Sequence, residues 1–257
     1  MKKLIFLLLC FGVGLMSCAQ QSPEDQFVYN NVQALGGAEK LASIMDQVGT
    51  WEFTMHMMPP DMPQGEDGPM TSPMTITYKR PNKIRFDSYG PDGSVVHMSC
   101  YNGTEGWTME MGKRVDHNEA QLHEAESMAA TWIDGFQNYQ EKGYTLAAMP
   151  DEEIDGQNCN VIQVTDKHGT LQTNYVDPET NYVVRTSGKM VNYAGELESM
   201  YMTFQNYNMV DGVAVPHHVA QYNESGEMVW EAKLKEVKHN TGVEDSYFMA
   251  EVTSMKE

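Results

Sequence analysis

The amino-acid sequence predicts a mainly β (α+β) fold: a curled, unclosed antiparallel β-barrel of roughly ten strands with a helical lid. Apolar residues recur at helical spacing only before residue 50 and between residues 119 and 142. Elsewhere, short runs of alternating apolar and polar residues lie between turn dipeptides such as Asn102-Gly103 and Asp211-Gly212. A large twisted sheet curls and its apolar concave face needs a cover, so we expect the helices to lie across that face.

The N-terminal segment, residues 1–17, has the pattern of a secretory leader. Lys2 and Lys3 precede an apolar run that is too short to cross a bilayer as a permanent helix. The run ends in LMSC (residues 15–18), which resembles the lipobox of bacterial lipoproteins. We therefore expect a lipoprotein signal peptide at 1–17, lipidation of Cys18, and a lipidated tether at 18–23. The alternative is an ordinary signal peptide that happens to contain a cysteine.

Two helices are expected after the tether. Ser22 is a good N-cap and Pro23 suits the first turn, so the first helix should begin here and end at the glycines 36–37. The second helix is expected from Ala38 to Gly49, because its apolar residues lie on one helical face. From residue 50 the hydrophobic period changes from 3.6 to 2, which predicts that strands begin there.

A strand meander and one further helix make up the remainder of the predicted fold. The segment from residue 75 to 107 alternates apolar and polar residues between three turns. Residues 119–142 carry an aromatic and aliphatic stripe at three- and four-residue steps, which predicts an amphipathic helix. Strands separated by regular turns then continue from Tyr144 to the C-terminus. Residues 24–257 are expected to form a single domain.

The charge of the chain excludes some classes of partner. Among 257 residues there are 36 acidic and 17 basic ones, which gives a formal net charge of −19. Such a surface repels phosphate backbones, so we expect no nucleic-acid partner and a soluble monomer held to the membrane only by its lipid. Cys100 and Cys159 remain after the leader and Cys18 are set aside; they could form a disulfide or stay as buried thiols.

Several segments of the chain resemble the outer-membrane lipoprotein-sorting family, the LolA/LolB-like periplasmic lipoprotein carriers. They occur in the order found in that family: ALGGAEKLASI (34–44), YKRPNKIRFD (78–87), YNGTEGW (101–107), YVDPETNYVVR (175–185) and YNMVDGVAVPHHV (207–219). The resemblance implies a LolA-like lipid-binding domain at 24–257, whose interior receives acyl chains of lipoproteins or lipids. It also implies a lipid-anchored carrier or acceptor facing the periplasm, at the outer membrane of the bacterial envelope.

A cavity for acyl chains requires an almost wholly apolar lining, because each methylene taken out of water is worth about 0.8 kcal/mol. Alternation along the strands and the stripe of the 119–142 helix provide the candidates. They are Ile84, Phe86, Trp107, Leu122, Trp132, Phe136, Met200, Met202, Phe204 and Trp230. The same residues could instead fill a packed core, as in a non-catalytic envelope adaptor that docks partners on its surface. Arg85 and Arg185 could hold a head group at the rim, or be ordinary solvated arginines.

The sequence also bears on metal binding and on catalysis. The methionine-rich segment around His56, residues 55–74, suggests a Cu(I)-binding lipoprotein as an alternative, although a mobile apolar loop has the same composition. His117 and His123 lack metalloprotease spacing, and His217-His218 should point to opposite faces of a strand. Nucleophile motifs and a glycine-rich phosphate loop are missing from the sequence. We therefore expect no enzyme activity, no cofactor and no metal.

Overall fold

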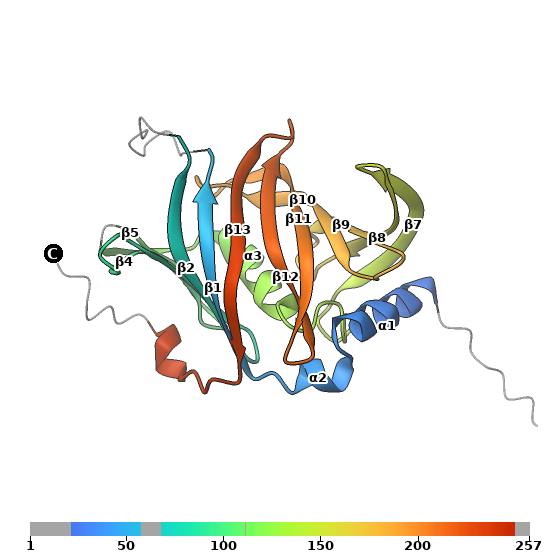
Figure 1. The fold of residues 1–257 in the computed structure, drawn as a ribbon, viewed down its shortest axis with the longest axis horizontal. Helices are drawn as coiled ribbons and strands as arrows, with labels where there is room; N and C mark the ends of the chain where they lie inside the picture. The colour runs from blue at the N-terminus through green and yellow to red at the C-terminus, as the bar shows by residue number, and fades with distance from the viewer. Residues whose placement is uncertain (1–21, 58–67, 111, 250–257) are drawn as a thin grey trace, which may run out of the picture.

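The computed structural model describes residues 22–57, 68–110 and 112–249. Its strands within these ranges form one antiparallel sheet in the order β6-β5-β4-β3-β2-β1-β13-β12-β11-β10-β9-β8-β7 (Figure 1). The strands are β1 Asp46–Met55, β2 Met70–Lys79, β3 Lys83–Tyr89, β4 Val95–Tyr101, β5 Gly106–Glu110, β6 Lys113–Asp116, β7 Thr145–Ile154, β8 Gln157–Thr165, β9 Leu171–Val176, β10 Val183–Val191, β11 Leu197–Val210, β12 Val213–Asn223 and β13 Met228–His239. The predicted class, a curled and unclosed antiparallel sheet, is confirmed, with 13 strands in place of about ten.

The order of the strands determines where the longest connection runs. β6 and β7 are consecutive in the chain but lie at the two opposite edges of the sheet. The segment between them contains α3, Glu119–Thr131, which therefore crosses the concave face and contacts β3, β4 and β5 on one side and β10 on the other. Figure 1 shows α3 enclosed by the curl of the sheet. The expected helical cover is present.

The two N-terminal helices lie at another place on the sheet. α1, Pro23–Leu35, contacts β12 and β7, and α2, Ala38–Ala42, follows it (Figure 1). Ser22 caps α1 by accepting a hydrogen bond from the backbone N–H of Asp25 at 3.1 Å, as predicted from the sequence. α1 ends at Gly36, whose φ of 129° excludes most side chains, and a Cβ there would clash with the Gly212 carbonyl oxygen.

Two predicted helix ends were wrong. The second helix ends at Ala42, not at Gly49, because β1 begins at Asp46 and pairs with both β13 and β2. The third helix ends at Thr131, and residues 132–143 form successive turns instead of continuing to 142. Gly135 and Asn138 take φ values of 51° and 55° there, which is incompatible with a right-handed helix.

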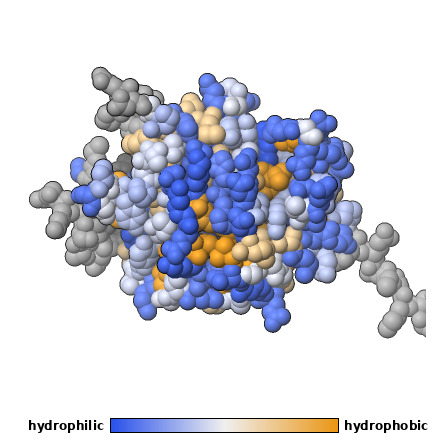
Figure 2. Space-filling model, viewed as in Figure 1, coloured by the Kyte–Doolittle hydropathy of each residue, from blue (hydrophilic) through white to orange (hydrophobic). Residues whose placement is uncertain are grey.

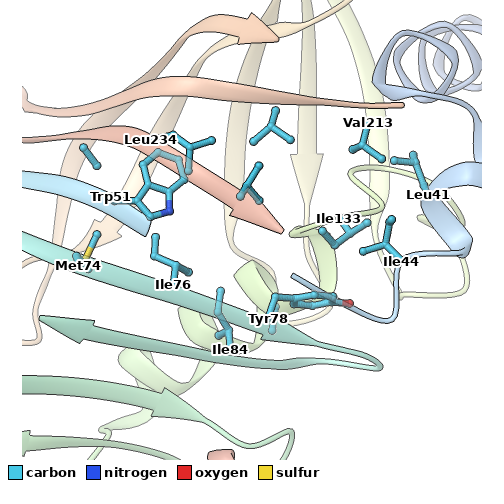
Figure 3. Packing of buried hydrophobic residues seen from close by; sticks show 14 of the residues in the cluster. Leu41, Ile44, Trp51, Met74, Ile76, Tyr78, Ile84, Ile133, Val213 and Leu234 are labelled. Atoms are coloured by element: carbon cyan, nitrogen blue, oxygen red, sulfur yellow. The ribbon is translucent and has the colours of Figure 1, made fainter. Parts of the chain in front are cut away.

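The main hydrophobic core lies between the sheet and its helical cover. Trp51, Ile76 and Ile84 from the sheet point into the same interior as Ile133, which follows α3 (Figure 3). Leu41 and Ile44 close one end of this interior and are fully buried. A second cluster, which includes Phe27 and Ile162, lies where α1 covers β8 and β9.

The outer face of the sheet carries polar residues over much of its area. Figure 2 shows a predominantly hydrophilic face over the central strands, with apolar residues gathered toward its middle and lower part. A short 3-10 helix, Asp245–Phe248, covers part of the outer face near β3 through a third cluster, formed by Met98, Cys100, Trp107, Met109 and Phe248.

Some expectations fall on residues outside the described ranges. The signal peptide at 1–17, the lipidation of Cys18 and most of the 18–23 tether are among them, as are Met58 and Met62 of the methionine-rich segment. Cys100 and Cys159 are described, and both are buried free thiols. Of the described helices, none has the length and apolar character needed to cross a membrane.

Candidate functional site

The candidate site is the interior between α3 and the concave face of the sheet. Residues that face each other across neighbouring strands share a face, so the strand register shows which side chains point inward. Ala232 of β13 belongs to the main core and pairs with Val219 of β12, which pairs with Phe204 of β11. Phe204, Met202 and Met200 alternate along β11 and therefore lie on the inner face.

Inner-face side chains of this region keep partial exposure to solvent. Phe53, Phe86, Val219 and Trp230 from the sheet pack against the core without being fully buried. The same is true of the helix residues that face them, which are Leu122, Ala125 and Met128, and of Trp132 just after the helix. The apolar side chains on both walls are therefore less completely buried than core residues such as Ile84 and Ile133.

Aromatic contacts hold two parts of this interior together. Phe86 of β3 and Trp132 meet in an edge-to-face arrangement, with ring centroids 6.3 Å apart. Phe53 of β1 and Trp230 of β13 are tilted neighbours at 5.6 Å. Alternation along TWEFTM (residues 50–55) could have identified Phe53 from the sequence, but it was not among the predicted lining residues.

Most, but not all, of the predicted lining residues come together. Ile84, Phe86, Leu122, Trp132 and Trp230 belong to the main core or pack against it, and Met200, Met202 and Phe204 share its face. The structure places Trp107 and Phe136 elsewhere.

Trp107 lies on the outer face and does not join the other candidates. Trp107 pairs with Cys100 of β4, and Cys100 pairs with Arg85 of β3, so these three side chains share one face of the sheet. Ile84 and Phe86, on either side of Arg85, point to the opposite, inner face. Trp107 packs instead against Phe248 in the third cluster. Alternation showed that Trp107 lies on one face of its strand but could not show which one, and the C-terminal segment that covers it lies far away in sequence.

Phe136 lies in the second cluster. Its ring is 5.6 Å from that of Phe27 on α1, next to Tyr144, Ile162 and Val164. The predicted helix would have placed Phe136 on the same stripe as Trp132. Because the helix ends at Thr131, Phe136 turns toward α1 instead.

Hydrogen bonds between charged side chains connect α3 to the sheet. Glu126 of α3 accepts hydrogen bonds from Lys167 Nζ at 2.6 Å and His168 Nε2 at 2.7 Å, both in the β8–β9 turn. His123, one turn earlier, stacks on the ring of His168 with centroids 3.7 Å apart. Burial raises the pKa of Glu126, but its hydrogen bonds with Lys167 and His168 more than offset this, and the pKa is lowered. We call Glu126, Lys167, His168 and His123 the α3 latch.

A second carboxylate on α3 lies in a different environment. Glu124 accepts a 3.3 Å hydrogen bond from the backbone N–H of Val191 in β10. Burial raises the pKa of Glu124 to about 7, and the bond from Val191 only partly offsets that effect. This carboxyl group therefore changes charge near neutral pH at the contact between helix and sheet.

The segment after α3 is fixed by Arg80. Its Nη1 donates to Asp134 at 2.7 Å, and its Nε and Nη2 donate to the carbonyl oxygens of Ile44 and Leu41 at 2.6 and 2.8 Å. Arg80 thus joins the segment after α3 to α2 and to the residues that follow α2.

Within the described ranges, the side chains considered for copper or another metal do not form an assembled binding site. Met55 and Met74 are buried, whereas Met57 and Met70 are 40% and 46% exposed. Within the described ranges, no group of three or more His, Cys, Asp or Glu residues is arranged to hold a metal ion.

The histidines noted in the sequence make other contacts. His117 lies 3.2 Å from Thr108 Oγ1, and burial lowers its pKa. His218 contacts Glu231, while His217 faces the carbonyl of Val215.

Cys100 is not an activated nucleophile. Burial raises the pKa of its thiol to about 12, although Arg85 lies close enough to lower it in part. The guanidinium of Arg85 donates to Asp87 and stacks on the ring of Tyr247. Arg85, which could have held a head group at the rim, is therefore engaged in an ion pair within the protein.

Comparison with known proteins identifies the fold. No protein-family model and no curated protein sequence matches the chain. A DUF1329 family protein from Desulfovibrio piger is similar in structure, with a TM-score of 0.61, 11% identity, and coverage of 90% of this chain and 98% of that one. A LolA superfamily protein from Nitrosomonas europaea has a TM-score of 0.57 at 12% identity, covering 87% and 96%.

A protein domain assigned to outer membrane lipoprotein sorting, from Vibrio parahaemolyticus, has a TM-score of 0.56 at 14% identity. The match covers 87% of this chain and 94% of that one. The family resemblance seen in the sequence segments is therefore confirmed by structure, at the level of the fold. The chain has the LolA-like fold.

Proposed function

We propose that this protein is a lipid-anchored carrier or acceptor in the bacterial periplasm, which holds acyl chains of lipoproteins or other hydrophobic ligands between α3 and the sheet. The observation that carries the proposal is the partial exposure of apolar side chains on both walls of the interior. A small protein gains stability by burying such side chains completely, so exposed inward aromatics are costly unless a guest covers them.

The outer membrane lipoprotein-sorting and LolA assignments of two structural relatives support the same class of cargo. The proposal includes lipidation at Cys18, anchoring at the outer membrane, and a single lipid-binding domain after the tether. It involves no covalent step, since binding and release of an acyl chain require only burial of hydrocarbon and movement of a cover.

α3 is the element whose movement would admit and release the guest. It crosses the concave face, and the α3 latch holds it to the β8–β9 turn. A disulfide between α3 and the sheet should prevent exchange of a bound chain, and reduction should restore it. Unchanged exchange in the oxidised form would show that α3 is not the gate.

The binding test uses native mass spectrometry of the protein with straight-chain alcohols from octanol to dodecanol. If hydrocarbon is buried, affinity should rise roughly fourfold per methylene, the factor that corresponds to about 0.8 kcal/mol. No dependence on chain length would contradict an apolar interior site.

Substitutions on β11 provide the matched pair for this test. Met202→Glu places a charge on the inner face and should reduce dodecanol binding by about tenfold or more, because an unpaired charge next to hydrocarbon is costly. Leu197→Glu is the control on the same strand, since Leu197 is 53% exposed. Equal affinities in the two variants would contradict the assignment of the inner face.

A further inference from the structure

A cleft on the sheet lies where β10 and β11 separate. Pairing between these strands ends at Arg185 and Thr203, and β11 continues beyond that point paired only with β12. The cleft has a volume of about 430 Å³, within the usual range for small-molecule sites. Val184 and Phe204 provide apolar wall, and Tyr182 stacks on Tyr207 at one end of it.

Arg185 lines this cleft without an acidic partner. Arg80, Arg85 and Arg114 each form an ion pair with an aspartate, whereas Arg185 forms neither an ion pair nor a hydrogen bond with the described residues. Its Nε is buried without a partner, and so is the hydroxyl of Thr203, which also lines the cleft. In a chain of net charge −19, a half-buried arginine left without a carboxylate is unusual.

Aromatic rings fix the guanidinium in place. Its carbon lies 3.6 Å from the centroid of the Tyr201 ring and 5.9 Å from that of Tyr175. Stacking covers a face of the planar group and leaves the edge that carries the two Nη atoms for a ligand, while Nε is buried. A held arginine with free edge donors is suited to bind two oxygens of a carboxylate or phosphate at once.

Two carboxylates in the cleft restrict which anion fits. Asp155 and Asp177 line the same cleft, and among the described residues neither forms an ion pair with Arg185. Asp177 accepts bonds from the Glu179 N–H at 2.9 Å and the Thr180 hydroxyl at 2.7 Å, so it is held in its turn. Their charge disfavours a dianion and favours a ligand with a single negative charge.

We propose that this cleft is a binding site for the monoanionic head of an amphiphile, a carboxylate or a phosphodiester, recognised by Arg185 and Thr203. The apolar wall formed by Val184 and Phe204 takes the adjoining part of the chain. The donors of the site, Arg185 and Thr203, pair across β10 and β11 on the face opposite the α3 interior, whereas Phe204 borders both the cleft and that interior. The site adds selection by charge to the apolar binding of the proposed function, and it stands without that function because its argument rests on the cleft alone.

The test compares dodecanoate with dodecanol at pH 8 by isothermal titration calorimetry, since the two share a chain and differ in head-group charge. Wild-type protein should bind dodecanoate about tenfold more tightly than dodecanol, and Arg185→Gln should remove that preference while dodecanol binding is kept. Dodecanoyl lysophosphatidylglycerol is the phosphodiester arm, and the tighter ligand identifies the head group.

Lys189→Gln is the matched control, because Lys189 is an exposed cation on the same strand and changes the net charge equally. It should keep the preference for the anion. Arg185→Lys keeps the charge but loses the planar guanidinium, so it should give an intermediate preference for the anion. This variant also keeps the result interpretable if Arg185→Gln does not fold. Circular dichroism melting of each variant verifies that the fold is intact.

The outcomes separate the two proposals. Equal binding of dodecanoate and dodecanol by the wild type, or an anion preference that survives Arg185→Gln, would overturn the head-group site and leave the interior site standing. Anion binding that depends on Arg185, with no dodecanol binding at all, would support the head-group site and contradict the proposed function.

Discussion

Replacing Glu124 should change the stability of the contact between α3 and β10 in a pH-dependent way. The carboxyl group of Glu124 lies at this contact, and burial raises its pKa from an ordinary 4.5 to about 7. A shift of that size corresponds to about 3 kcal/mol once the group is ionised in both the folded and the unfolded state. The side chain is mostly buried, so solvent screening reduces this figure only modestly.

The direction of the pH effect follows from the raised pKa. Below about pH 4.5 the group is protonated in both states and carries no penalty. The stabilising contribution of the protonated form is lost as the pH rises from 4.5 through about 7. Glu124→Gln keeps a hydrogen-bond acceptor for the Val191 N–H but cannot ionise, so it should stabilise the protein by up to about 3 kcal/mol at pH 8 and hardly at all near pH 4.5.

Urea unfolding of wild type and variant at pH 4.5, 6 and 8 measures this effect, because the difference between the two proteins cancels other titrating groups. Glu119→Gln is the charge-matched control, since Glu119 is exposed on the same helix, and it should change the midpoint at pH 8 much less. A Glu124→Gln variant no more stable than wild type at pH 8 would refute the burial of a charged carboxylate at this contact.

Three further predictions follow from other contacts. Asp134→Asn should destabilise the protein by about 2–3 kcal/mol in urea unfolding, because it leaves the half-buried Arg80 without its carboxylate, and a smaller loss than 1 kcal/mol would contradict that role. Burial acts to raise the pKa of Asp46, but bonds from Thr241, Gly242 and Val243 outweigh it and lower the pKa. Stability from Asp46 should therefore be lost as the pH falls below about 4, and Asp46→Asn should abolish that component of the acid transition, as a wild-type and variant pH titration would show. The Cys100 thiol should react with Ellman's reagent at least about tenfold more slowly in folded than in urea-unfolded protein, and equal rates would contradict its burial.

Local signals in the sequence predicted the parts of the fold that depend on local physics. Ser22 and Pro23 predicted the start of α1, and alternation between turns predicted an antiparallel sheet. The predicted end of the second helix was wrong, because the spacing of its apolar residues fits a short helix followed by a strand equally well. Val48 falls within the helix predicted from Ala38 to Gly49 but lies in β1, where pairing on both sides decides the conformation.

The site was predicted in part because alternation gives the spacing of inward residues but not the identity of the inner face. Phe204 and Trp230 lie on the concave side, whereas Trp107 faces outward under the C-terminal segment. The α3 latch could not be foreseen, since Glu126 and His168 are 42 residues apart and meet only in the folded chain. The cleft at Arg185 likewise depends on where two strands separate, which no periodicity shows.

Quenching of tryptophan fluorescence by bromine-labelled dodecanol, in wild type and in Trp107→Phe, bears most directly on whether an alkyl chain enters between α3 and the sheet. Trp51, Trp132 and Trp230 face that interior and Trp107 does not. A chain bound there should quench the wild type, and the quenched fraction should increase in Trp107→Phe. No quenching, or quenching that disappears with Trp107, would contradict an acyl-binding interior.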